Sequence, residues 1–265
     1  MRTIEAEPGI WTGPMLRKVP ALTAWFWVVK LVTTALGEAV SDYLVKRFDP
    51  VPVVLVGFVA FAVSLAVQLR ARRYVAWLYW SVAAMVSVFG TMGADVAHVG
   101  LGIPYAVSVV VCGIALAATF VLWDRNEHTL SIHSITTTPR EAFYWAAATV
   151  TFALGTATGD FTAVTLHLGY LSSAILFVCV FAIPAIGYWR FRMNGVLAFW
   201  FAYIVTRPVG ASFADWFAKP VSDGGLGHGD ALVSVVLAIA LVALAALLTV
   251  TGLDDPTRAP VDGHR

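Results

Sequence analysis

Residues 27–42 read WVVKLVTTALGEAVSD and begin the pattern that decides the fold. The pattern returns as WSVAAMVSVFGTMGAD at 80–95, as WAAATVTFALGTATGD at 145–160 and as WFAYIVTRPVGASFAD at 200–215. In every copy a tryptophan stands fifteen positions before an aspartate, and a glycine stands five positions before it. Three identities at fixed spacing, found four times, indicate tandem repeats.

The composition places these repeats in a membrane. The chain has 265 residues, of which 59% are hydrophobic and 12% charged, about half the charged fraction of an ordinary soluble domain. A helix needs about 20 residues to cross a bilayer. Eight apolar segments reach roughly that length: 21–45, 52–69, 74–98, 104–123, 141–165, 168–189, 195–218 and 231–251.

The sequence therefore predicts an all-α integral membrane protein of eight transmembrane helices. We expect one transmembrane domain, 21–251, made of four tandem two-helix repeats at 21–70, 74–123, 141–189 and 195–251. Each repeat crosses the membrane twice, so all four point the same way. We therefore expect a pseudo-symmetry axis along the membrane normal.

The distribution of basic residues predicts the orientation. Twelve lie in loops on the N-terminal side: Arg2, Arg17, Lys18, Arg70, Arg72, Arg73, Arg125, Arg140, Arg190, Arg192, Arg258 and Arg265. The loops on the other side hold three: Lys46, Arg47 and Lys219. We expect both ends, 1–20 and 252–265, to be cytoplasmic tails.

The three repeated residues have separate structural expectations. The tryptophans, roughly 22 Å before the aspartates at 1.5 Å per residue, should lie near the cytoplasmic interface and anchor the repeats there. The glycines should allow close helix approach, or mark breaks where backbone carbonyls face a pathway. These positions are Trp27, Trp80, Trp145 and Trp200, with Gly37, Gly90, Gly155 and Gly210.

The aspartates should share one face with other polar residues, because residues four apart lie on the same side of a helix. Four-residue steps give Lys30, Thr34, Glu38 and Asp42; Ala83, Ser87, Thr91 and Asp95, with His98 beyond; Ala148, Phe152, Thr156 and Asp160; and Tyr203, Arg207, Ala211 and Asp215. The even-numbered helices are almost purely apolar. We therefore expect the odd helices inside, lining a polar chamber that opens to the outer side.

This chamber is the candidate site. Its acids would be Glu38 and the four aspartates, Asp42, Asp95, Asp160 and Asp215. Lys30 is expected to pair with Glu38 or with an acid across the chamber, and Arg207 with Asp215 or with a neighbouring repeat. Carboxylates suit hard divalent cations. The predicted metal ligands are Asp42, Glu38, Asp95, His98 and Asp160.

The pattern resembles a family of bacterial membrane proteins that carry four copies of a two-span repeat of unknown function with a tryptophan. The matching residues are the Trp, Gly and Asp columns, and the resemblance covers nearly the whole chain. It implies the same four-repeat architecture in the bacterial inner membrane. It implies no particular activity.

The leading functional hypothesis is a transporter or permeation pathway for a small cation, coupled to protons if the buried acids exchange them. An intramembrane enzyme or a binding protein for a lipid headgroup, cofactor or polar small molecule is one alternative. A structural subunit, whose acids only hold the bundle together, is the other. No nucleotide, haem or zinc motif is present, so we expect a transport protein rather than an enzyme.

The expected partners are the lipid bilayer and a small cation. The net charge of +1 gives no indication of a nucleic-acid partner. A divalent cation is the one cofactor that the pattern suggests. The sequence leaves open whether one chain closes the chamber or a homo-oligomer does.

Overall fold

The structure, a computed structural model, describes residues 16–258 of the chain. This range contains eight long helices and no β-strand, which confirms the predicted all-α fold. The parts of the expected tails at 1–15 and 259–265 lie outside the described residues. The long helices are α1 (Ala24–Arg47), α2 (Pro50–Arg70), α3 (Ala76–Asp95), α4 (Tyr105–Glu127), α5 (Thr138–Asp160), α6 (Tyr170–Phe191), α7 (Gly195–Ala218) and α8 (Asp230–Thr251).

Local sequence sets where these helices begin and end. Asp49 precedes α2 and accepts a hydrogen bond from the Val51 amide at 3.0 Å, while Pro50 takes the first helical position, where no N–H is needed. Asn194 caps α7 by accepting from two amides of its first turn. Helix α8 ends at Gly252, whose φ of 64° lies in the left-handed region that glycine adopts without strain.

Two of the inner helices continue into a π-helical turn. The turn η1 (Val96–Gly100) follows Asp95 at the end of α3, and η3 (Phe161–Thr165) follows Asp160 at the end of α5. Such turns are rare and are often found at functional sites. Two short 3-10 turns, η2 (Ile132–Ser134) and η4 (Val221–Asp223), lie in the loops before α5 and α8.

Six of the eight long helices in residues 16–258 are long and apolar enough to cross a membrane, namely α2, α3, α4, α6, α7 and α8. The chain is therefore a multi-pass membrane protein. The sequence also predicts crossings by α1 and α5, which have 24 and 23 residues but a more polar composition. In α1 the charged residues Lys30, Glu38 and Asp42 are buried. Protein surrounds these groups, which removes the cost of placing them in lipid.

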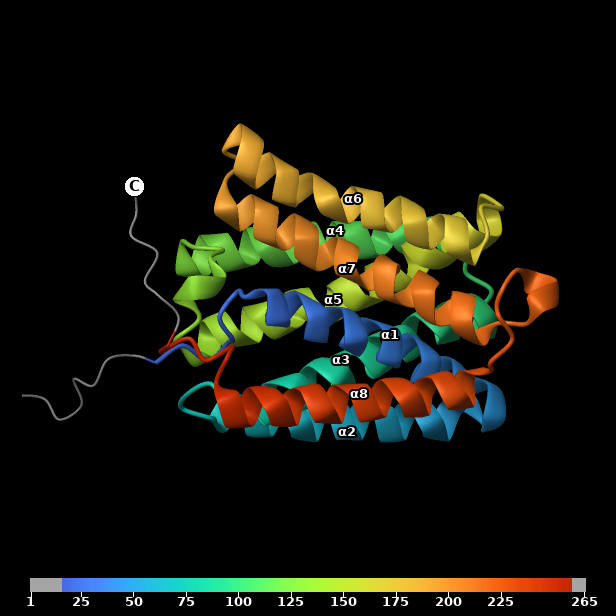
Figure 1. Ribbon diagram of the computed structural model, residues 1–265, viewed down its shortest axis with the longest axis horizontal. Helices are drawn as coiled ribbons and strands as arrows, with labels where there is room; N and C mark the ends of the chain where they lie inside the picture. Colours follow the sequence, from blue (N-terminus) through green and yellow to red (C-terminus); the bar gives the residue numbers. More distant parts are fainter. Residues whose placement is uncertain (1–15, 259–265) are drawn as a thin grey trace, which may run out of the picture.

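The odd-numbered helices form a closed inner ring. In the side view of Figure 1 they lie between α4 and α6 above and α2 and α8 below. Helix α1 packs against α3, α3 against α5, α5 against α7, and α7 returns to α1. Each even-numbered helix covers the inner helix of the following repeat, so that α2 lies on α3, α4 on α5, α6 on α7 and α8 on α1. The fourth repeat thus meets the first within one chain, and the ring closes without a second copy. An axis along the membrane normal stays a prediction, with which this cyclic order agrees.

The repeated glycines lie where neighbouring inner helices touch. Each one abuts the next repeat, at the residue that stands eight positions before the aspartate there. The pairs are Gly37 with Ser87, Gly90 with Phe152, Gly155 with Arg207, and Gly210 with Thr34. A Cβ at any of these glycines would come closer than 3.0 Å to its partner. The inner helices run through the glycines without a break, so the glycines here allow close approach.

The tryptophan column packs inside the protein. Trp80, Trp145 and Trp200 are buried, and Trp27 is half-buried. They belong to an aromatic cluster in which Trp80 packs on Tyr79, with ring centroids 5.0 Å apart. An interface anchor would contact lipid headgroups, but the three buried rings are enclosed by protein. They join the repeats to one another at this end of the bundle.

The two ends of the described chain meet beside these tryptophans. Trp80 Nε1 donates a hydrogen bond to the Asp254 carboxylate at 3.1 Å, and the Tyr74 hydroxyl donates to the same oxygen. The Ala21 amide donates to the Asp254 carbonyl at 2.8 Å. Burial, together with the charge of Asp254, raises the pKa of Tyr74 above its usual value. Both ends lie at one end of the bundle, as an even number of crossings requires.

We predict that Gly90→Ala destabilises the protein. The added Cβ meets the Phe152 Cβ, and such overpacking typically costs about 1–3 kcal/mol. The matched control is Gly93→Ala in the same helix, where a Cβ meets nothing within 4 Å. Thermal unfolding in detergent should show a lower Tm for Gly90→Ala and an equal or higher Tm for Gly93→Ala. Equal behaviour of the two variants would contradict the role given to the glycine column.

Candidate functional site

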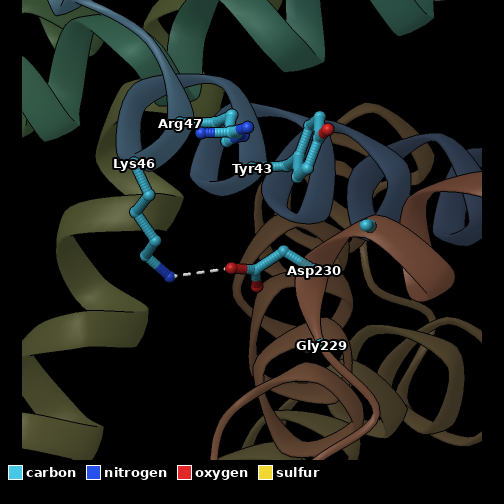
Figure 2. Close-up of a pocket in the computed structure, with 6 residues that line it drawn as sticks. Tyr43, Lys46, Arg47, Gly229 and Asp230 are labelled. Carbon is cyan, nitrogen blue, oxygen red and sulfur yellow. Dashed lines mark hydrogen bonds and ion pairs between the residues drawn. The ribbon is translucent and has the colours of Figure 1, made fainter.

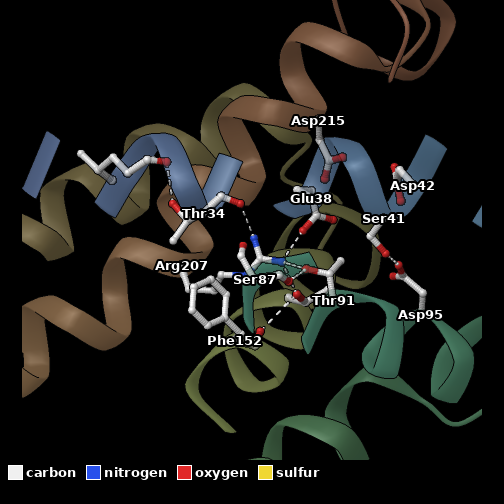
Figure 3. A network of polar contacts seen from close by, with 12 residues as sticks. Thr34, Glu38, Ser41, Asp42, Ser87, Thr91, Asp95, Phe152, Arg207 and Asp215 are labelled. Atoms are coloured by element: carbon white, nitrogen blue, oxygen red, sulfur yellow. Dashed lines mark hydrogen bonds and ion pairs between the residues drawn. The ribbon is translucent and has the colours of Figure 1, made fainter. Parts of the chain in front are cut away.

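The centre of the inner ring holds one arginine. Arg207 of α7 is fully buried, and its Nη1 donates a hydrogen bond to the Thr34 carbonyl at 2.9 Å. Its Nη2 donates to Glu38 Oε2 and Thr156 Oγ1, each at 2.7 Å, and to the Thr91 hydroxyl (Figure 3). The acceptors belong to α1, α3 and α5. A single guanidinium therefore bonds the fourth repeat to the other three.

The repeat pattern explains why Arg207 fits this place. Its partners Glu38, Thr91 and Thr156 all stand four positions before the aspartate of their own repeat. The fourth repeat has Ala211 at that position, which leaves room in this layer. The long side chain of Arg207, one turn earlier on α7, reaches into the layer and supplies its cation.

Lys30 does not pair with an acid, and that prediction is wrong. Its Nζ lies 4.1 Å from the ring centroids of both Phe152 and Tyr203 and has no hydrogen-bond partner among the described residues. Glu38, its expected partner, pairs with Arg207 instead. Both rings face its Nζ, which is the geometry of a cation–π contact.

Phe152 separates this lysine from the arginine. The guanidinium carbon of Arg207 lies 5.3 Å from the Phe152 ring centroid, and the same ring contacts Lys30. Beyond Tyr203, the hydroxyls of Tyr79, Tyr144 and Tyr203 are hydrogen-bonded in series. The interior on the tryptophan side of Arg207 is thus filled by aromatic rings and the side chain of Lys30.

Three acids gather on the other side of Arg207. One carboxylate oxygen from each of Glu38, Asp160 and Asp215 lies within 4.8 Å of the other two. We call these residues the acidic triad; they come from α1, α5 and α7. Glu38 is paired with Arg207 and Asp215 with a lysine. The Asp160 carboxylate makes no hydrogen bond or ion pair to any residue in 16–258.

The lysine at the triad is Lys219, which the sequence analysis places only in an outer loop. Its Nζ lies 3.1 Å from Asp215 Oδ1 and also pairs with Asp42. Burial favours the neutral amine, but the charges of Asp215 and Asp42 outweigh it and raise the pKa of Lys219 above its usual value. The four-residue step that defines the polar face predicts this position, because Lys219 stands one step beyond Asp215.

The remaining predicted ligands stand apart from the triad. Asp42 pairs with Lys219 and, at 2.9 Å, with Lys46. Asp95 accepts a hydrogen bond from Ser41 at 2.6 Å. His98 packs its ring against Tyr105, with centroids 4.3 Å apart, and neither ring nitrogen has a partner among the described residues.

The predicted metal set is therefore rearranged. Glu38 and Asp160 stay together, whereas Asp42, Asp95 and His98 are outside the group whose oxygens converge. Of the two partners expected for Arg207, the structure shows the neighbouring repeat, through Glu38, and Asp215 belongs to the triad. Sequence spacing places each acid on the polar face of its own helix, but it does not say which helices bring their side chains together.

A surface pocket adjoins this end of the bundle, lined by Tyr43, Lys46, Arg47, Gly229, Asp230 and Ala231 (Figure 2). Lys46 bridges the pocket and the interior, since its Nζ pairs with Asp230 at 3.0 Å and with Asp42 at 2.9 Å. Charges of alternating sign thus run from Asp230 through Lys46, Asp42 and Lys219 to Asp215.

Comparison with known proteins identifies the repeats. Residues 25–74, 78–129, 143–194 and 198–253 match the family described as Repeat of Unknown Function (DUF347). The chain belongs to this family. The four matched segments of this DUF347 protein overlap the four repeats read from the Trp, Gly and Asp columns. Searches of curated proteins and of solved structures found no match, so the function must be argued from the site itself.

We predict that Arg207→Met strongly destabilises this DUF347 protein, because it leaves Glu38 buried without a counter-ion. Breaking a buried pair typically costs about 3–5 kcal/mol. Adding Glu38→Gln to Arg207→Met should restore part of the loss, since no charge then remains unpaired. Exposed Arg190 provides the matched control, and Arg190→Met should change stability by less than about 0.5 kcal/mol.

Thermal unfolding of the wild type, Arg207→Met, Glu38→Gln, the double variant and the Arg190→Met control in one detergent measures these effects. Losses that simply add in the double variant would contradict the pairing of Arg207 with Glu38.

Proposed function

We propose that this protein binds a small divalent cation at the acidic triad and carries it across the membrane. The observation that supports this most is the convergence of three carboxylates from three inner helices, with oxygens within 4.8 Å of one another. Oxygens that share one Mg²⁺ or Ca²⁺ at about 2.0–2.6 Å lie within about 5 Å of each other. The donor set and its spacing both suit a hard cation of this kind.

The charge balance of the site supports the same proposal. Five carboxylates, Glu38 and the four aspartates, lie near three cations, Arg207, Lys219 and Lys46. With all eight groups charged, two negative charges remain uncompensated, and such an excess is costly inside a membrane. The aspartates also lie toward the C-terminal ends of their helices, where the helix dipole disfavours anions. A divalent cation would neutralise the excess.

The interior favours a carrier over an open pore. A cation moving from the triad toward the tryptophan end would meet Arg207, then Phe152 and Lys30. Arginine stays protonated in proteins, so its charge opposes the passage of a cation. Transport would require the inner helices to move relative to Arg207, which corresponds to an alternating-access mechanism.

The proposed route begins at the end of the bundle that bears the triad. The alternating charges from Asp230 to Asp215 connect the pocket of Figure 2 with the triad. The excess of basic residues in loops at the opposite end supports a cytoplasmic location for that end. We therefore place the triad toward the outer face of the bacterial inner membrane as part of the proposal.

A structural role for the acids is the competing proposal, and one observation favours it. Arg207 joins all four repeats through Glu38, Thr34, Thr91 and Thr156, so part of the polar cluster holds the bundle together. Asp160 separates the two proposals, because it makes no such bond.

We predict that Asp160→Asn abolishes cation transport and leaves the fold intact. In proteoliposomes, uptake of Mn²⁺, Mg²⁺ or Ca²⁺ by the wild type should fall at least about tenfold in the variant, as expected when one of three charged ligands becomes neutral. The matched control is Asp223→Asn in the exposed turn η4, which should transport like the wild type.

A melting assay on the same proteins distinguishes binding from structural duty. A cation at 100 times its wild-type dissociation constant should stabilise the wild type by about 2.7 kcal/mol and Asp160→Asn by about 1.4 kcal/mol or less. If no cation is bound or transported by the wild type, and Asp160→Asn lowers the Tm, the structural proposal is correct and the transport proposal is wrong.

A further inference from the structure

Within residues 16–258, Lys219 is the residue outside the membrane-spanning helices whose side-chain cation contacts the triad. It follows directly after α7, and its Nζ pairs with Asp215 of the triad and with Asp42 of α1. The Lys219 ammonium therefore pairs with one of the three carboxylates that would bind the proposed cation.

The backbone of Lys219 is held firmly by the glycine-rich loop that follows. The four backbone carbonyls of residues 216–219, at the C-terminal end of α7, accept hydrogen bonds from loop amides at 2.7–3.2 Å. The pairs are Trp216 with Leu226, Phe217 with His228, Ala218 with Gly229, and Lys219 with Gly227. The loop passes so close that a Cβ at Gly225 would overlap the Lys219 carbonyl. The main chain is fixed, so any movement of the ammonium is a movement of the side chain alone.

The side chain of Lys219 is bound less firmly than that of Arg207. Arg207 has no exposed side-chain surface and donates four hydrogen bonds to three other helices. The Lys219 side chain is 17% exposed, and Asp42 and Asp215 are its polar partners in the described chain. Its four-carbon stem is flexible, and an ammonium is readily hydrated. Arg207 is thus bound at the site by more bonds than Lys219 and is more completely buried.

An unpaired hydroxyl beside the triad marks a place for a ligand. Ser212 lies one turn before Asp215 on α7, is 2% exposed and has no hydrogen-bond partner among the described residues. Its Oγ lies 4.0 Å from where a Cβ of Gly159 would be, and Gly159 directly precedes Asp160. This buried, unpaired oxygen lies between α5 and α7, the helices that carry Asp160 and Asp215 of the triad, and oxygen is the ligand type that a hard cation takes.

We infer that Lys219 is a tethered cation that pairs with Asp215 in the free protein and is displaced outward when a divalent cation enters the triad. This inference rests on the proposed cation site and adds the group that competes for it. Asp42 keeps a partner after the exchange, because Lys46 bonds the same carboxylate oxygen, Oδ2, that Lys219 leaves. The exchange favours a divalent ion, since a monovalent ion would replace one charge with one charge.

The test is a calorimetric titration of the purified full chain with Mn²⁺ alone. Lys219→Met removes the competing charge and keeps much of the apolar stem, so it should bind Mn²⁺ at least about tenfold more tightly than the wild type, a gain of about 1.4 kcal/mol. The matched control is Arg190→Met, which removes an exposed cation at the opposite end of the bundle and should change the affinity less than about threefold, because exposed charges are screened.

The possible results separate the inference from the proposed function. Equal or weaker Mn²⁺ binding by Lys219→Met, with the wild type still binding, would overturn the displacement and leave the cation site standing. Absence of Mn²⁺ binding in both proteins would overturn the cation site and the inference together.

A measurement on the wild type covers the case in which Lys219→Met does not fold. Amine-reactive labelling of Lys219, quantified by peptide mass spectrometry, should rise several-fold in saturating Mn²⁺, because the displaced ammonium becomes exposed and free of its acids. Labelling of Lys18, paired with Glu141 at the other end of the bundle, is the internal reference and should not change. Unchanged labelling of Lys219 in Mn²⁺ would contradict the displacement.

Discussion

The rest of the structure depends on one buried guanidinium. A charge inside a membrane protein needs partners, and Arg207 takes its partners from every other repeat, at Thr34, Glu38, Thr91 and Thr156. Gly155 allows α5 to approach the base of its side chain, and Ala211 leaves room at its tip. The same cation divides the interior into an aromatic half on the tryptophan side and an acidic half on the other.

Residues shared by the four repeats and residues that differ between them have separate roles. The Trp, Gly and Asp columns build the frame, since the glycines close the inner ring and the tryptophans pack its end. The chemistry comes from unlike residues at equivalent positions. Where one repeat has Arg207, the others have Thr34, Ser87 and Phe152. These differences turn four similar hairpins into a single site with a defined cation and a defined unpaired acid, Asp160.

The sequence predicted the helices and their polar faces, because composition and the helical period are local properties. It did not predict the pairings, because these depend on which helices meet and where long side chains reach. Lys30 was expected beside an acid, but its amine lies between two aromatic rings that come from other repeats. Lys219 was assigned to a loop although it continues the four-residue step after Asp215. The tryptophans match the pattern of an interface anchor, yet neighbouring repeats enclose three of them.

The most direct test of this account is to locate a cation at the triad. Crystals of the full chain grown with Mn²⁺ would be measured at a wavelength where manganese scatters anomalously. The account predicts one strong anomalous peak within bonding distance of the carboxylates of Glu38, Asp160 and Asp215. A map without a peak there, at a Mn²⁺ concentration that fills other divalent sites, would contradict the central claim.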